Sequence, residues 1–180
     1  GTRDSERRFE LRELAPDDVE ERLRRVRCEE ERREVRDVLG LTLWPLAQED
    51  GVFGATGGEL WRASVLLAER LHECLPRGAR VLEVGAGLGV AGLTAARLGH
   101  RVLLTDVDDA VVHNLRRAIA HNGLARLATA AALDLAAPPQ SADDDTTVLL
   151  AADVVYTPRL ADHLAAFLAA RRFALPPRPP

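Results

Sequence analysis

Two overlapping glycine spacings occur in the stretch VLEVGAGLGVAG, residues 81–92 of this 180-residue chain. Counted from Gly87 to Gly92, the stretch has the G-x-G-x-x-G spacing of a dinucleotide-binding loop, in which glycines let the backbone approach a pyrophosphate. Counted from Glu83 to Gly89, it has an acid followed by G-x-G-x-G. That spacing suits S-adenosylmethionine (SAM), which carries a sulfonium and an ammonium and has no phosphate to place on a helix N-terminus. The two spacings therefore predict different cofactors.

The dinucleotide interpretation fits poorly in either position. The first glycine of that loop follows the strand directly, because it makes the tight turn into the helix. If Gly87 is the first glycine, Gly85 and Ala86 become an unexplained spacer. If Gly85 is the first, the third position is Val90, whose branched side chain opposes the close packing of helix on strand. The SAM interpretation needs no spacer, and Gly92 is then a packing glycine inside the following helix.

Further candidate residues stand where other predicted strands end. Asp106 follows the strand after the glycine stretch, where a carboxylate could accept both ribose hydroxyls in either cofactor class. Later the chain reads AADVVYTP, which places Asp153 and Tyr156 three residues apart. A carboxylate can orient an amine and an aromatic ring can pack on its apolar stem or cationic head, a use that hydride transfer does not require. This pair favours a methyl donor with an amine acceptor.

Alternating strands and helices are predicted around these residues. The apolar runs VLEV, VLLT and VLLAA are typical of strands buried on both faces, and amphipathic segments separate them. We therefore expect an α/β fold with a parallel sheet, helices on both faces, and a ligand site between the first and fourth strands at their carboxyl ends. Strands are expected at residues 80–84, 101–105, 127–133 and 148–152, and helices at 59–75, 88–98, 108–121 and 160–171, with a weaker helix at 16–39.

The composition separates a charged arm from an apolar domain. We expect a partly helical or flexible arm over residues 1–40, a SAM-binding domain over 41–175 and a proline-rich tail over 176–180. The net charge of −4 and the interspersed Arg residues do not favour nucleic acid. The two cysteines are far apart, so neither a disulfide framework nor a metal site is expected. Without a long apolar run, we expect a soluble intracellular protein, cytoplasmic or nuclear, with no membrane contact.

The chain resembles methyltransferase family 16, a group of seven-β-strand enzymes whose characterised members are mostly protein lysine methyltransferases. The resemblance covers about residues 57–170, and the D-x-x-Y after the fourth strand is its most specific feature. The matching segments are GGELWRASVLLAERL, VLEVGAGLGVAGLTAARLG, VLLTDVDDAVVHNLRRAIAHNG, LDL and TTVLLAADVVY.

This resemblance implies a Rossmann-like fold, SAM as cofactor, a lysine of a protein substrate as acceptor, and a set of site residues. Asp153 and Tyr156 would frame the lysine channel as catalytic residues. Trp61 would border the cofactor, Asp106 would hold the ribose, and Asp134 or Leu135 would meet the adenine. The remaining cofactor-binding positions that it implies are Glu83, Gly85, Ala86, Gly87, Gly89 and Ala152.

Two departures from the family pattern leave other functions open. Leu135 stands where family members usually have Trp, so an aromatic contact to adenine is missing. The complete fold has seven strands in the order 3-2-1-4-5-7-6, and only four are found here. We therefore hypothesise a C-terminally truncated form. The alternatives are a catalytically impaired SAM-binding or partner-binding protein, and a SAM-dependent enzyme that acts on a small molecule or nucleic acid. The sequence does not indicate an oligomeric state.

Overall fold

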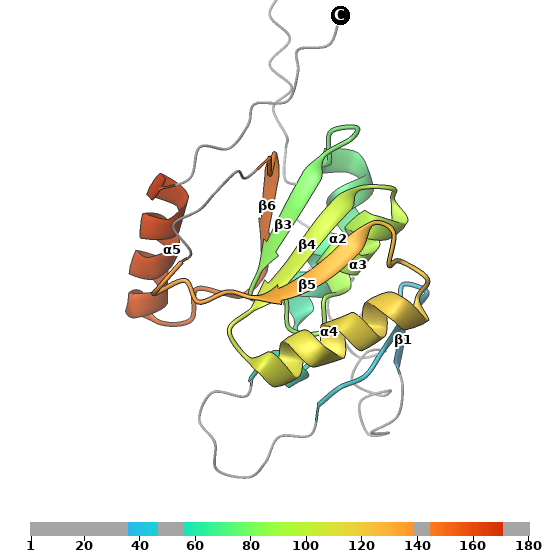
Figure 1. The fold of residues 1–180 in the computed structure, drawn as a ribbon, viewed down its shortest axis with the longest axis horizontal. Helices are drawn as coiled ribbons and strands as arrows, with labels where there is room; N and C mark the ends of the chain where they lie inside the picture. The colour runs from blue at the N-terminus through green and yellow to red at the C-terminus, as the bar shows by residue number, and fades with distance from the viewer. Residues whose placement is uncertain (1–35, 47–55, 139–144, 171–180) are drawn as a thin grey trace, which may run out of the picture. The chain divides into compact units, whose positions relative to one another are not determined.

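A computed structural model describes residues 36–46, 56–138 and 145–170 of the chain (Figure 1). The described residues contain a four-stranded parallel sheet, a short antiparallel hairpin and four α-helices. Most of the predicted N-terminal arm and the whole proline-rich tail lie outside the described residues. The proposed domain boundaries and the hypothesis of a truncated form stay predictions.

The parallel sheet has the strand order β5-β4-β3-β6. Its strands are β3 (Arg80–Val84), β4 (Arg101–Asp106), β5 (Ala128–Ala132) and β6 (Val148–Ala151). Val81 pairs with Val102 of β4 on one side and with Val148 of β6 on the other. The chain thus moves outward from β3 to β5 and then returns to the opposite side of β3. This places the topological switch point between β3 and β6, as predicted, and all four predicted strands are confirmed.

Helices cover both faces of this sheet, which confirms the predicted α/β class. They are α2 (Arg62–Cys74), α3 (Val90–Arg97), α4 (Asp109–His121) and α5 (Pro158–Ala170). Side chains of a strand alternate between faces, so Val81 joins a core with α2, α3 and α4, whereas Leu82 and Val84 join a second core with α5. In this second core Phe167 is only 1% exposed. Figure 1 shows α5 apart from the other helices.

A hairpin lies before α2 in the chain and corrects one prediction. Strands β1 (Arg36–Val38) and β2 (Leu41–Leu43) pair in antiparallel register, so the helix expected to reach Leu39 is wrong over residues 36–39. Leu39 and Gly40 have φ of 53° and 72°, as in the two-residue turns that match strand twist. In β2 the outer residues are buried and the middle one is half-buried, a period of two rather than of a helix.

Candidate functional site

The glycine loop, residues 85–89, connects β3 to α3 at the carboxyl edge of the sheet. Gly85 and Gly87 have φ of 59° and 54°, in the left-handed region that side chains with a Cβ rarely adopt. Within the loop, the Gly89 amide donates to the Ala86 carbonyl at 2.8 Å. The Ala86 amide donates to the carbonyl of Thr105 in β4 at 2.9 Å, which fixes the loop against the neighbouring strand. Helix α3 then begins at Val90.

The backbone of this loop lies close to two other segments of the chain. A Cβ on Gly87 would lie 3.2 Å from the carbonyl oxygen of Gly57, and a Cβ on Gly85 would lie 2.6 Å from the Cγ1 of Val154. Gly85 is exposed and Gly87 is buried against Gly57, so neither position has room for a side chain, and the open backbone of the loop lies at Gly85. The donor set therefore fits a ligand that binds by backbone approach, as the G-x-G-x-G spacing predicts.

Asp106 ends β4 beside the glycine loop. The residue is 8% exposed. Oδ2 accepts a hydrogen bond from the Gly87 amide at 3.0 Å, and Oδ1 accepts one from the Asp108 amide at 3.2 Å. Two carboxylate oxygens have about four acceptor positions between them, so acceptor capacity remains for a pair of hydroxyls. Asp106 therefore lies beside the glycine loop at the carboxyl edge of the sheet, and its contact with the ribose stays a prediction.

Glu83 lies behind the glycine loop, in the interior. Its side chain is 1% exposed, and Oε2 accepts a hydrogen bond from the Gly92 amide of α3 at 2.8 Å. Burial raises the pKa of Glu83 from 4.5 to about 8, the Gly92 amide opposes this shift, and the nearby Asp106 charge adds to it. A Cβ on Gly92 would collide with this carboxylate. Gly92 is therefore a packing glycine, as predicted, and Glu83 joins the strand to the helix beneath the loop.

The segment after β6 brings the D-x-x-Y residues to the same edge. Val154 packs against Gly85, so this segment contacts the glycine loop directly. Asp153 is exposed and has φ of 58°, a left-handed conformation that is uncommon for a residue other than glycine. Tyr156 is 65% exposed. Ala152 is half-buried between the strand and these residues. The structure thus brings Asp153, Tyr156 and the glycine loop together at one sheet edge.

The remaining predicted residues lie at the margins of the site. Trp61 precedes the first residue of α2, where its carbonyl accepts from the amide and hydroxyl of Ser64, and its side chain is 38% exposed. Asp134 is exposed and accepts from the Ala136 amide at 2.8 Å in a turn after β5. Leu135 is half-buried and packs against the core that includes Phe167. No adenine contact is assigned, so the roles of these residues stay predictions.

Three residues at this edge were missed in the sequence. Val107 follows Asp106 and is 68% exposed, which leaves an apolar surface beside the acid. Gly57 and Val154 contact the glycine loop from two sides. The weak signals for them were the glycine pair before Trp61 and the apolar pair inside D-V-V-Y. Neither signal could show that the two segments meet the same loop.

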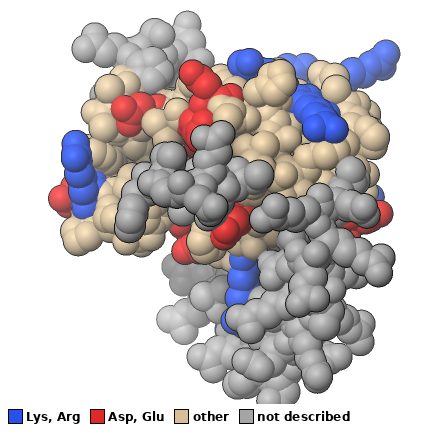
Figure 2. Space-filling view, turned by 90° about the horizontal axis from the view of Figure 1, so that it is seen from below, with Lys and Arg blue, Asp and Glu red and all other residues tan. Residues whose placement is uncertain are grey.

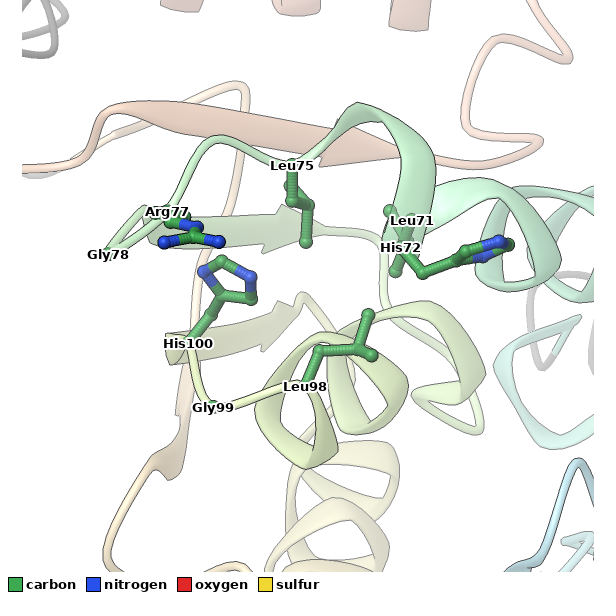
Figure 3. A pocket seen from close by; sticks show the side chains of 8 residues that line it. All are labelled: Leu71, His72, Leu75, Arg77, Gly78, Leu98, Gly99 and His100. Atoms are coloured by element: carbon green, nitrogen blue, oxygen red, sulfur yellow. The ribbon is translucent and has the colours of Figure 1, made fainter. Parts of the chain in front are cut away.

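The opposite, amino edge of the sheet has a separate pocket of about 260 Å³ between α2 and the end of α3. Figure 3 shows the His100 imidazole facing Arg77 within it. Its lining residues are Leu71, His72, Leu75, Arg77, Gly78, Leu98, Gly99 and His100, none of which belongs to the predicted site.

Within the described ranges, no cluster of three or more potential metal ligands occurs. No helix in that part of the chain is long and apolar enough to cross a bilayer.

The fold and the glycine loop define a class: a Rossmann-like α/β domain of the kind found in SAM-dependent methyltransferases. Two solved structures share this fold. The glycopeptide N-methyltransferase MtfA aligns with a TM-score of 0.51 and 18% identity over 64% of this chain and 50% of that chain. The [4+2]-cyclase SpnF aligns with a TM-score of 0.52 and 22% identity over 72% of this chain and 49% of that chain. At such identities they show the fold alone.

Sequence comparison gives the family within that class. The profile of the lysine methyltransferase family matches residues 42–171, and the chain belongs to this family. Methyltransferase-like protein 22 of Mus musculus is 34% identical over 131 residues, 60% of this chain and 33% of that protein. The Homo sapiens protein of the same name is 33% identical over 129 residues, 59% of this chain and 32% of that protein. The chain thus spans about a third of the length of these curated relatives.

Proposed function

We propose that this protein transfers methyl groups from SAM to a lysine side chain of a protein substrate. The observation that carries the proposal is the contact of Val154 with Gly85, which sets the D-V-V-Y segment against the glycine loop. An acceptor held by Asp153 and Tyr156 would then lie next to a donor held by the loop. Membership in the lysine methyltransferase family supports the same acceptor.

Cofactor binding is assigned to residues of the carboxyl edge. When bound, SAM supplies a methyl group activated by its sulfonium. The backbone at Gly85, Ala86, Gly87 and Gly89 would face its methionine end, with Glu83 bracing this loop from behind. In the same arrangement Asp106 would accept from the ribose hydroxyls. The outer contacts would come from Trp61, Val107, Asp134, Leu135 and the backbone of Ala152.

The acceptor side must present a neutral amine. A lysine side chain is protonated near neutral pH, so the site must favour loss of that proton before the amine attacks the methyl group in line. We propose that the exposed Asp153 carboxylate orients the amine and that the Tyr156 ring packs on its stem or cationic head. Holding the two reactants in line supplies much of the rate, because methyl transfer depends on alignment.

The charge around the site supports a cationic acceptor. Asp108 is half-buried and Asp134 and Asp153 are exposed, and each follows the carboxyl end of a strand. In Figure 2 several acidic side chains lie toward the middle of the face shown, and the Arg side chains lie mainly nearer its margin. Acidic side chains gathered at one edge raise the local concentration of a cation and oppose a phosphate backbone. This favours a lysine over a nucleic acid as acceptor.

Labelled methyl transfer in a cell extract tests the acceptor class. The chain is incubated with methyl-labelled SAM and extract pretreated with protease or with nuclease. The proposal expects label in protein, its loss after protease treatment, and methyl-lysine after acid hydrolysis. The chain itself contains no lysine, so automethylation adds no methyl-lysine background. Label that survives protease and is lost with nuclease, or that enters a small molecule, would overturn the lysine assignment.

Calorimetry separates cofactor binding from turnover. We expect Asp153→Asn and Tyr156→Ala to keep the SAM affinity of the wild-type chain and to lose most of the methyl transfer. Asp162→Asn changes an exposed acid on α5 and serves as the matched control, with transfer retained. SAM binding by the wild-type chain without transfer to any extract protein would instead support the alternative of a SAM-binding protein without catalysis.

A further inference from the structure

A backbone strap connects helix α4 to the cofactor loop. We define the strap as residues 41–46 together with Gly57 and Gly58, all of which the structure describes. Its two parts are joined by the Leu46 amide, which donates to the Gly58 carbonyl at 3.0 Å. Leu41 and Leu43 are fully buried in the main core. The strap is therefore part of the folded domain, and its position depends on what holds it.

Asparagine side chains of α4 and its C-terminal cap hold the first part of the strap. The Asn122 Oδ1 accepts from the Thr42 amide and its Nδ2 donates to the Thr42 carbonyl, both at 2.9 Å. One side-chain amide thus satisfies both backbone groups of Thr42, as a neighbouring strand would. Two turns earlier in α4, the Nδ2 of Asn114 donates to the Trp44 carbonyl at 2.7 Å, and Asn114 is 5% exposed.

The side chain of Trp44 is fixed by the same helix. The Arg117 guanidinium carbon lies 4.3 Å from the centroid of its ring, a cation–π distance. The His121 ring meets Trp44 edge-on, with centroids 4.8 Å apart and planes at 85°. Helix α4 therefore holds Trp44 both by its backbone and by its ring.

The far end of the strap reaches the cofactor loop. A Cβ on Gly58 would lie 2.7 Å from the Cβ of Leu46, so these two parts are in close contact. A Cβ on Gly57 would lie 2.7 Å from the Val111 Cγ2 and 3.7 Å from the Asp106 Oδ2. The Gly57 carbonyl in turn lies against Gly87 of the glycine loop. The strap thus ends beside the carboxylate and the backbone that are assigned to the cofactor.

We propose that Asn114 and Asn122 are positioning residues for SAM binding. They hold the strap by its backbone and thereby set where Gly57 lies over Gly87 and beside Asp106. Neither asparagine is assigned a contact with the cofactor, so their effect is transmitted through Trp44, Leu46 and Gly58. The inference rests on the proposed function only through the methyl donor and is independent of the acceptor.

Calorimetric SAM titrations of Asn114→Ala, Asn114→Asp and Asn122→Ala test this inference. The Asp variant keeps the size of the side chain and removes the donor to Trp44. All three are expected to weaken SAM binding by roughly tenfold, the effect of losing one or two buried hydrogen bonds that order the site. His113→Ala, at an exposed neighbour on α4, is the matched control and is expected to keep wild-type affinity.

Two further measurements exclude a merely structural effect. Phe167→Leu loosens the core on the opposite face and should lower the melting temperature while the Kd for SAM stays the same. Without cofactor, amide exchange at Leu46 and Gly87 should accelerate in the asparagine variants and not in Phe167→Leu. An unchanged Kd in the asparagine variants, or an equal loss of affinity in Phe167→Leu, would overturn the inference. If the wild-type chain does not bind SAM, both this inference and the proposed function are overturned. If it binds SAM but methylates no lysine, only the proposed lysine acceptor is overturned.

Discussion

The glycine loop and the D-V-V-Y segment follow neighbouring parallel strands, end at the same sheet edge and contact one another, yet they differ in burial. Around the glycine loop, Glu83 and Gly92 are packed in the interior, and Gly87 and Gly89 are buried. Beyond β6, Asp153 and Tyr156 are exposed. The cofactor side is thus built into the hydrophobic core, so changes there should alter stability strongly, whereas changes at the exposed acceptor residues should alter stability little and activity mainly.

Glu83→Gln should give the largest effect, and one that depends on pH. The native pKa is raised from 4.5 to about 8, so the folded state keeps a proton that the unfolded state releases. The free energy of unfolding of the wild type therefore falls as pH rises from 4.5 to about 8. Above that range the buried carboxyl is ionised and the whole loss of stability is present. Glutamine can still accept from Gly92 and does not titrate. Urea unfolding between about pH 5 and about pH 9 should show the variant gaining a few kcal/mol over the wild type. A difference that is constant with pH would contradict this.

Gly85→Ala should be the next largest change, because it combines two costs. A left-handed residue with a Cβ costs about 1–2 kcal/mol, and the collision with Val154 adds roughly 1–3 kcal/mol. Gly78→Ala isolates the first cost, since Gly78 has φ of 71° and open space around its Cβ position. The double variant Gly85→Ala with Val154→Ala should recover the second cost in denaturant unfolding. If it does not, the two segments are not in contact.

Asp153→Gly should be modestly stabilising. Glycine relieves the left-handed strain at φ of 58° and loses part of this gain to its greater freedom in the unfolded chain, for a net gain of about 0.5 kcal/mol. Asp162→Gly, inside α5, is the opposite control and should lose about 0.3 kcal/mol, since glycine has a lower helix propensity than aspartate. Both values come from chemical denaturation. A loss of stability in Asp153→Gly would show that the carboxylate contributes to folding.

Tyr156→Ala should have the smallest effect on stability. The side chain is 65% exposed, so the free energy of unfolding should stay within about 0.5 kcal/mol of the wild-type value. Methyl transfer should nevertheless fall strongly if the ring packs on the acceptor. A clear fall in melting temperature would place Tyr156 in the packed structure and would erase the contrast between the two sides of the site.

The parallel sheet was predictable from local pattern. Apolar runs of four to six residues are long enough for a buried strand, and the turns between them carry Gly, Pro or Asn. The prediction of the strand of residues 80–84 agrees with the structure residue by residue. The hairpin of β1 and β2 was not predictable in the same way. Its strands have three residues each, and one turn residue is a leucine at positive φ, which a tertiary contact must favour. The Arg97 guanidinium supplies that contact by donating to the Leu39 carbonyl at 2.7 Å.

The candidate site, like the fold, was predictable only in part. The G-x-G-x-G spacing, the acid at the end of β4 and the D-x-x-Y segment are short motifs, so the sequence alone predicted the cofactor class and the edge of the sheet that binds it. The tertiary structure decided which way each side chain faces. It buries Glu83 against Gly92, sets Val154 on Gly85, and brings Gly57 over Gly87 through a strap held by Asn114 and Asn122. These contacts join residues far apart in the chain, and their geometry follows from packing, which local spacing does not encode.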